Sequence, residues 1–226
     1  MRVALLALVA LALTGCGGER TSGRATLWVT REAGARVLYT GSVPAGLNAI
    51  QALERARKVT TRYGGRYVQS IDGGAGSLSS QHDWFLFVNG IESDTGGADV
   101  RLRPGDVEWW DYRSWAGGRM TVPVVAGAFP EPFLHGFQWA KPGATVVYRR
   151  PADAPLARRL AHDVGGRAST AGTAGGNTIE IASGSAAPSA ISRVSDRVRL
   201  VLAPALARRL ADDPAALRFR YEPAPG

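Results

Sequence analysis

The stretch from Asp83 to Tyr112 decides the fold that we predict for the first half of the chain. It contains DWFLFV at Asp83–Val88, the pair Asn89-Gly90, and VEWWDY at Val107–Tyr112. Aromatic and β-branched residues favour strands, and Asn-Gly between apolar runs is a strong short-range signal for a hairpin turn. We therefore expect a hairpin after the first run and a further strand at the second.

The segment upstream predicts two strands, a helix and another strand. Ala25–Thr30 and Val37–Val43 have the composition of strands. Gly46–Thr60 carries apolar residues three positions apart, which predicts one apolar stripe on a helix. Arg66–Ile71 predicts a strand, and the glycine- and serine-rich Asp72–Gln81 predicts a loop. The order strand-strand-helix-strands predicts an α+β fold with a β-grasp-like amino-terminal domain over residues 25–116.

The second half alternates predicted strands and helices, which favours a small α/β domain over residues 117–226. Two segments have helical periodicity, Ala154–Val164 and Ala203–Ala211, and both contain the pentapeptide LARRL. The pentapeptide marks either a weak internal repeat or two similar amphipathic helices, and we favour the helices. The strands that we predict here are Met120–Val125, Thr145–Tyr148, Thr178–Ala182, Val198–Leu202 and Leu217–Tyr221.

The amino terminus has the pattern of a bacterial lipoprotein signal. Arg2 precedes the apolar run Val3–Leu13, which is too short for a stable membrane span of about 20 residues. The sequence LTGC that ends at Cys16 resembles the lipobox, in which the cysteine thiol takes a diacylglyceryl group. We predict a signal peptide over residues 1–15, and a lipidated Cys16 with a polar tether over residues 16–24. The alternative is an ordinary secretory signal followed by an incidental cysteine.

Composition narrows the possible environments and functions. Cys16 is the single cysteine, so the mature chain forms no internal disulfide and offers no cysteine nucleophile. The net charge is +8, but the basic residues are scattered along the chain, so we expect no nucleic-acid partner. There is no Gly-x-Ser-x-Gly elbow and no phosphate loop, and we expect no enzymatic activity.

Four ordered segments of the first half resemble the transcobalamin-like carboxy-terminal domain of bacterial surface lipoproteins, a largely uncharacterised family. They are GLNAIQALE from Gly46, GRYVQSIDG from Gly65, WFLFVNG from Trp84 and PGDVEW from Pro104. The resemblance covers about Thr26 to Tyr112. It implies a β-rich module that, in the cobalamin carriers, closes over a corrinoid from one side. This chain lacks the helical domain that supplies the other side, so a cobalamin-like ligand is an analogy.

Aromatic residues are the main candidates for ligand binding. In a strand, Trp109 and Trp110 point to opposite faces, while Trp110 and Tyr112 share one. We predict a flat aromatic platform for a planar ligand, because exposed aromatic patches mark interaction sites. The alternative is that Trp84 and Trp109 are core residues, and that the other aromatic side chains pack against the second half. The candidate ligand-binding residues are Trp84, Trp110, Tyr112, Trp115 and His135.

No two of the three histidines stand at metal-ligand spacing, so we expect no metal site and no tightly bound cofactor. The sequence as a whole favours an extracytoplasmic binding lipoprotein, attached to the membrane by lipid. We expect it to capture a small, corrinoid-like ligand, or to dock on an uptake-system membrane protein. The alternative is a non-catalytic protein–protein or cell-envelope module with no small ligand.

Overall fold

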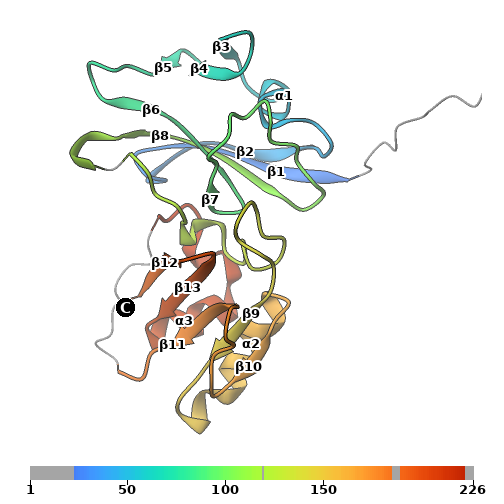
Figure 1. Cartoon of the computed structure of the whole chain (residues 1–226), viewed down its shortest axis with the longest axis vertical. Helices are drawn as coiled ribbons and strands as arrows, with labels where there is room; N and C mark the ends of the chain where they lie inside the picture. Colours follow the sequence, from blue (N-terminus) through green and yellow to red (C-terminus); the bar gives the residue numbers. More distant parts are fainter. Residues whose placement is uncertain (1–22, 119, 185–188, 222–226) are drawn as a thin grey trace, which may run out of the picture.

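The apolar strands of the first half assemble into one five-stranded sheet. The computed structural model describes residues 23–118, 120–184 and 189–221. Strand order is β2-β1-β8-β6-β7, with β8 at the centre. β8 runs parallel to β1 and antiparallel to β6, and this pairing places residues distant in sequence side by side (Figure 1). The strands are β1 (Arg24–Arg31), β2 (Arg36–Pro44), β6 (His82–Val88), β7 (Ile91–Glu92) and β8 (Val107–Ser114).

One face of this sheet is covered by a short helix and a small second sheet. Helix α1 spans Ala49–Glu54, and its side chains Ile50 and Leu53 are buried. The small sheet has the order β3-β4-β5, in which β3 is Val59–Arg62, β4 is Tyr67–Ile71 and β5 is Gly74–Ala75. The resulting core holds Trp84 and Trp110, together with apolar residues of β1 and α1.

The predicted helix over Gly46–Thr60 is too long. Asn48 caps α1, which ends at Glu54. The last part of the predicted helix is a turn followed by β3, which pairs with β4 from Val59 to Arg62. The pairing satisfies backbone groups of β3 that a continued helix would have bonded internally. The glycines after Tyr63 therefore form a hairpin turn and do not stop a helix.

The second half forms a second five-stranded sheet with the order β10-β9-β11-β13-β12. β9, β10, β11 and β13 are parallel, while the edge strand β12 is antiparallel to β13. Helices α2 (Ala154–Asp163) and α3 (Pro204–Asp212) bury their leucines in the apolar core beside this sheet. The strands are β9 (Ala144–Val147), β10 (Arg167–Ser169), β11 (Asn177–Ile181), β12 (Ala190–Val194) and β13 (Arg197–Leu202).

Two predicted strands of the second half are wrong. Met120–Val125 forms only an isolated bridge, between Val124 and Ile91. The predicted strand Leu217–Tyr221 is also absent. Pro214–Leu217 is a 3-10 helix, and Phe219 and Tyr221 after it pack against the first domain. Val122, Val125, Phe219 and Tyr221 of these segments pack in the aromatic cluster between the domains, and neither segment forms a continuous ladder with a strand of either sheet. Strands β10 and β12 had no counterpart in the prediction.

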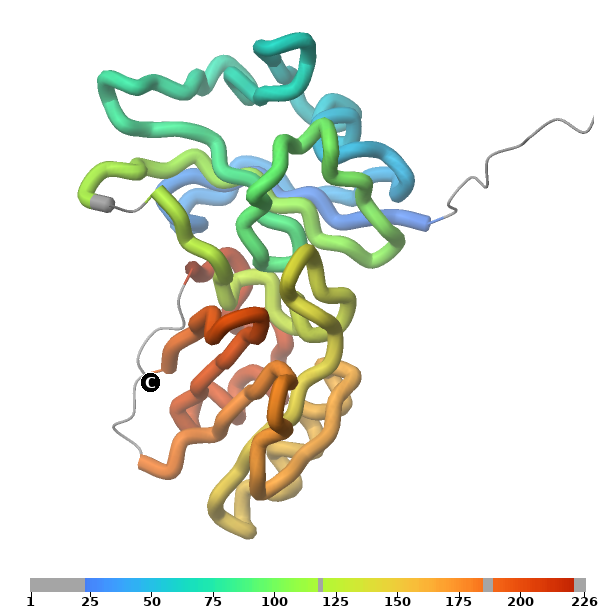
Figure 2. The backbone as a smooth tube through the Cα atoms, viewed as in Figure 1, coloured from blue at the N-terminus to red at the C-terminus, as the bar shows by residue number. Residues whose placement is uncertain are grey.

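The two domains meet at a third apolar cluster, on the face of the first sheet opposite to α1. Its buried members include Trp28, Phe87 and Trp109, and Phe219 and Tyr221 from the end of the chain pack against them. The ring of Phe219 lies 4.9 Å from Trp28, and that of Tyr221 lies 5.5 Å from Trp109. In Figure 2 the red end of the chain reaches the boundary with the upper domain.

The mixed sheets and few helices confirm the α+β class. The β-grasp assignment and the domain boundary between 116 and 117 stay predictions. The predicted signal peptide, Cys16 and most of the tether lie outside the described residues. Within the described residues, no helix has the length and apolar character to cross a bilayer.

Candidate functional site

The predicted aromatic residues divide between the core and a cleft. Trp84 and Trp110 are buried with exposed fractions of 6% and 4%, in the core beneath α1. Trp110 donates a hydrogen bond from Nε1 to Glu108, and Trp84 donates from Nε1 to the carbonyl of Gly74. Both indole N–H groups therefore have partners inside the domain, as buried indoles usually do.

Tyr112 lies at the edge of the same face, where β8 leaves the core. Its ring contacts Trp84 at 5.1 Å and stacks on His82 at 5.7 Å, and the Arg31 guanidinium lies 4.9 Å from the ring centre. Its hydroxyl donates to the carbonyl of Ala75. Tyr112 is thus held on several sides while part of its surface stays accessible.

Trp115 follows the end of β8 and is half-buried; its backbone N–H donates to the carbonyl of Gln81. His135 lies elsewhere, in the linker that joins the two domains between β8 and β9 (residues 115–143). Its Nδ1 is 2.5 Å from Oε1 of Glu131, which is buried, and burial raises the pKa of that carboxyl. Neither Trp115 nor His135 is among the residues that line the cleft containing Tyr112, which is described below.

The linker around His135 is fastened to the first domain by a buried asparagine. The side chain of Asn89 donates to Oδ1 of Asp106 and to the carbonyl of Gly136, at 2.8 and 2.9 Å. The side-chain oxygen of Asn89 accepts a hydrogen bond from the backbone N–H of Val107, where β8 begins. Asn89, which the sequence predicted only as a turn residue, thus connects the linker to the central strand β8 through hydrogen bonds.

A cleft of about 950 Å³ lies between the domains and includes Tyr112. Its walls come from the β1–β2 turn, the ends of β6 and β8, the linker and β12. Tyr221 closes it from the end of the chain. The lining residues are Arg31, Glu32, Ala33, His82, Tyr112, Arg113, Ser114, Thr121, Val122, Pro123, Val124, Ile191, Ser192, Arg193 and Tyr221.

Asp111 builds the wall formed by the β1–β2 turn. Its carboxylate accepts hydrogen bonds from the backbone of Ala33 and Gly34 and from the hydroxyls of Thr30 and Tyr221. Glu32 and Ala33 have positive φ angles of 59° and 54°. Non-glycine residues adopt this conformation only where the surroundings hold them, and such positions cluster at functional sites.

Arg113 follows Asp111 by two positions on β8, also lines the cleft, and is 5% exposed. Its guanidinium lies 3.6 Å from the ring centre of Phe85 and 3.8 Å from Oε1 of Glu92. Burial raises the pKa of Glu92, against the opposing influence of the Val122 N–H and of Arg113. Arg31 lies against the ring of Tyr112, while the side chain of Arg113 lies on the other face of β8, so the cleft offers an aromatic ring and two cationic groups.

Sequence reasoning missed His82, Arg31 and the β12 residues of this cleft. The alternating pattern of β6 puts His82 on the face of Trp84, and so beside Tyr112, once the antiparallel register is known. No sequence signal pairs β12 with this region, because the domain packing decides it. Over the described part of the chain, no three His, Asp, Glu or Cys side chains gather in a group able to hold a metal ion.

Residues 46–114 match a family described as a domain of unknown function (DUF4430). This segment coincides with most of the first domain, from α1 to the end of β8. A search of curated proteins gave no match.

Two solved structures are similar to part of the chain. One is described as a "putative metal binding protein from Ruminococcus gnavus ATCC 29149"; the match has 14% identity and a TM-score of 0.34, and covers 41% of this chain and 98% of that one. The other is haptocorrin in complex with Cbi, at 16% identity and a TM-score of 0.33 over 40% of this chain. The match spans 25% of the haptocorrin chain.

Proposed function

We propose that this protein is a non-catalytic, extracytoplasmic binding lipoprotein that holds a planar small molecule in the cleft between its domains. The observation that carries the proposal is the cleft of about 950 Å³ that contains Tyr112 with Arg31 against its ring, and that Arg113 also lines. Its volume is in the range of ligand sites, which is about 300–1,000 Å³. An aromatic surface with guanidinium groups beside it suits a flat ring system that carries acidic or carbonyl groups at its edge.

Corrinoids are the first ligands to test, because the first domain resembles the transcobalamin-like domain in the sequence segments from Gly46 to Trp109. A β-grasp-like arrangement of that domain is part of the same proposal, and the parallel pairing of β1 with β8 supports it. A place beside an uptake system would explain why a binding protein is held at the membrane.

The direct test is an ultraviolet-visible titration of the full chain with cyanocobalamin and with cobinamide. We expect a shift of the corrin bands, and at least tenfold weaker binding after Tyr112→Ala, because the variant removes the ring that lines the cleft. Tyr63→Ala is the matched control, since Tyr63 is 77% exposed on the β3–β4 turn, away from the cleft. An unchanged spectrum at tens of micromolar corrinoid would exclude corrinoids as the ligand. An equal loss of affinity in Tyr112→Ala and Tyr63→Ala would exclude the cleft as the binding site.

The location is tested separately from the ligand. We expect wild-type protein in the membrane fraction and Cys16→Ser protein in the soluble fraction, because two acyl chains give a durable anchor. Labelling with palmitate provides a second readout. A Cys16→Ser protein that stays in the membrane fraction would contradict the lipid anchor and leave the ligand test untouched.

A further inference from the structure

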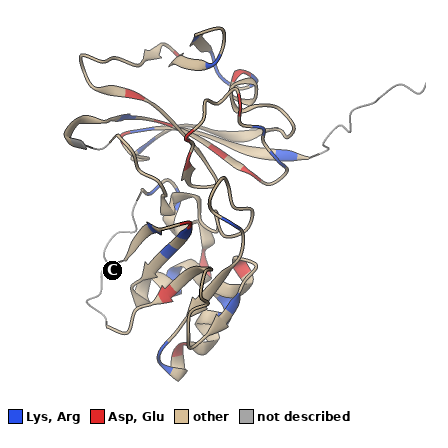
Figure 3. Ribbon diagram, viewed as in Figure 1, with Lys and Arg blue, Asp and Glu red and all other residues tan. Residues whose placement is uncertain are grey.

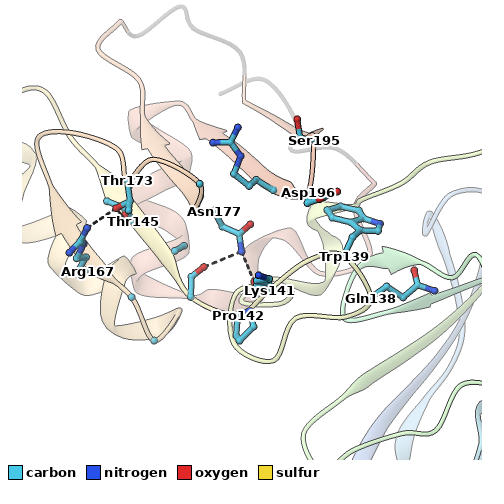
Figure 4. A pocket seen from close by; sticks show the side chains of 17 residues that line it. Gln138, Trp139, Lys141, Pro142, Thr145, Arg167, Thr173, Asn177, Ser195 and Asp196 are labelled. Atoms are coloured by element: carbon cyan, nitrogen blue, oxygen red, sulfur yellow. Dashed lines mark hydrogen bonds between the residues drawn. The ribbon is translucent and has the colours of Figure 1, made fainter.

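A second hollow lies in the carboxy-terminal domain, at the edge where the parallel strands begin. It has a volume of about 990 Å³ and is lined by the starts of β9, β10, β11 and β13 and by the end of the linker. It shares no lining residue with the cleft between the domains. Figure 4 shows Arg167 and Trp139 on opposite sides of this hollow, with Asn177 and Lys141 between them.

The frame of the hollow is fixed by a buried asparagine. Asn177 is 5% exposed; its side chain donates to the carbonyls of Lys141 and Gly143, and its oxygen accepts from the backbone of Val198. The linker and the start of β13 are thereby joined at one point (Figure 4). On the far side, Thr173 bonds both Thr145 and Arg167 at 2.7 Å, which fixes the loop before β11.

The charges that line the hollow are mainly positive. Lys141, Arg167 and Arg197 contribute cations, while Asp196 is its single carboxylate. Asp196 lies 3.5 Å from the Arg193 guanidinium, which offsets its charge. Among the described residues, Lys141, Arg167 and Arg197 form no ion pair, whereas Arg150, Arg159, Arg193 and Arg199 each have an acidic partner.

The walls also leave backbone groups accessible. Five of the lining residues are glycines, which allow close approach of a ligand to the main chain. The backbone N–H groups of Thr173 and Gly175 donate no hydrogen bond to any described residue. Free N–H groups beside cationic side chains are the combination by which proteins hold oxyanions.

We propose that this hollow binds a phosphate group, carried either by a soluble phosphorylated molecule or by a phospholipid headgroup. Lys141, Arg167 and Arg197 would neutralise the phosphate, and the unpaired N–H groups of the Thr173–Gly175 loop would bond its oxygens. The half-buried Trp139, whose ring lies 4.2 Å from the Arg193 guanidinium, would flank the rest of the molecule. The proposal does not depend on a ligand in the interdomain cleft.

Isothermal titration calorimetry of the full chain with inorganic phosphate and with glycerol 3-phosphate tests the soluble source. Sedimentation with phosphatidylglycerol vesicles, against phosphatidylcholine vesicles, tests the lipid source; this arm uses the Cys16→Ser chain, so that acylation does not mask the result. The variants are Lys141→Gln and Arg197→Gln. Each removes a charge-assisted hydrogen bond and is expected to weaken binding on the order of tenfold.

Arg158→Gln and Arg208→Gln are matched controls, because these exposed arginines lie on α2 and α3, outside the hollow. We expect both controls to bind like the parent protein, and binding to fall as sodium chloride is raised. A thermal melt of each variant shows that it is folded. The proposal is overturned if no phosphate compound or anionic vesicle binds, or if the controls weaken binding as much as Lys141→Gln and Arg197→Gln do.

Discussion

Two acidic side chains, Glu108 and Asp111, are fully buried on strand β8, and they differ in the number of hydrogen bonds that they accept. Asp111 accepts hydrogen bonds from four groups and organises the turn beside the cleft. Glu108 accepts from Nε1 of Trp110, and its Oε2 has no partner among the described residues. Burial therefore raises the pKa of Glu108 well above that of a free carboxyl. Glu108 is therefore expected to stay neutral at pH values where a free carboxyl is charged.

We predict that Glu108→Gln flattens the dependence of stability on pH. A carboxyl whose folded pKa is raised stabilises the fold fully below its unfolded pKa, and this stability is lost as pH rises towards the folded pKa. The loss has a limiting slope of about 1.4 kcal/mol per pH unit. Urea unfolding at pH 5 and pH 8 should show a smaller decline in the variant.

Part of the decline remains in Glu108→Gln, because burial also raises the pKa of Glu92 and Glu131. Glu54→Gln is the control, since Glu54 is exposed on α1 and should leave the pH dependence unchanged. A pH dependence of Glu108→Gln equal to that of the parent would show that Glu108 is charged in the folded state.

The sequence predicts the alternation of β8 correctly, but not what covers each face. Trp109 and Trp110 do point to opposite faces, as the strand period requires. However, the second domain meets the face of Trp109, and Trp110 packs beneath α1 in the first domain. Both faces are equally apolar in the sequence, so periodicity alone could not assign them.

Helix α1 is only six residues long and depends on its first turn. Asn48 accepts from the backbone of Gln51, and the Gln51 side chain accepts from the backbone of Asn48, which completes a capping box. A helix this short has little stability of its own, so its cap and its buried side chains Ile50 and Leu53 hold it in place.

We predict that Asn48→Ala lowers the free energy of unfolding by about 1 kcal/mol, the usual cost of a lost amino-terminal cap. Asn48→Asp keeps the acceptor oxygen and should be close to the parent. Urea denaturation with an unchanged m-value measures the difference. If the Ala and Asp variants lost equal stability, the cap would not explain the effect.

Elements that follow local signals were predictable, and those that depend on packing were not. The strands β6, β8, β11 and β13 and the helices α2 and α3 agree with apolar runs or helical spacing. The predicted strand Leu217–Tyr221 failed because Phe219 and Tyr221 are drawn into the aromatic cluster between the domains. The alternating residues of this segment resemble a strand, although no neighbouring strand is available to it.

At the scale of the whole molecule, the two domains are joined by the linker and by the returning end of the chain. Acidic and basic side chains are interspersed over both domains, so charge does not separate the two bodies (Figure 3). The aromatic cluster of Trp28, Trp109, Phe219 and Tyr221 instead supplies apolar contact between them.

We predict that Phe219→Ala destabilises the protein by about 1–3 kcal/mol, less than for a fully buried phenylalanine because Phe219 is only partly buried. The loss should appear in thermal or urea unfolding, together with faster proteolysis near the carboxyl end. Leu78→Ala is the control, since Leu78 is 84% exposed and should have no effect. A stability of Phe219→Ala equal to that of the parent would mean that this end of the chain does not hold the domains together.

Two asparagines bond the linker from the two domains, Asn89 from the turn after β6 and Asn177 from the start of β11, and this has a kinetic consequence. They anchor the linker to both sheets, so the width of the cleft between the domains is fixed before a ligand binds. No hinge step should then precede its capture. The observed association rate should rise in proportion to ligand concentration. A slow opening of the cleft would instead produce a plateau.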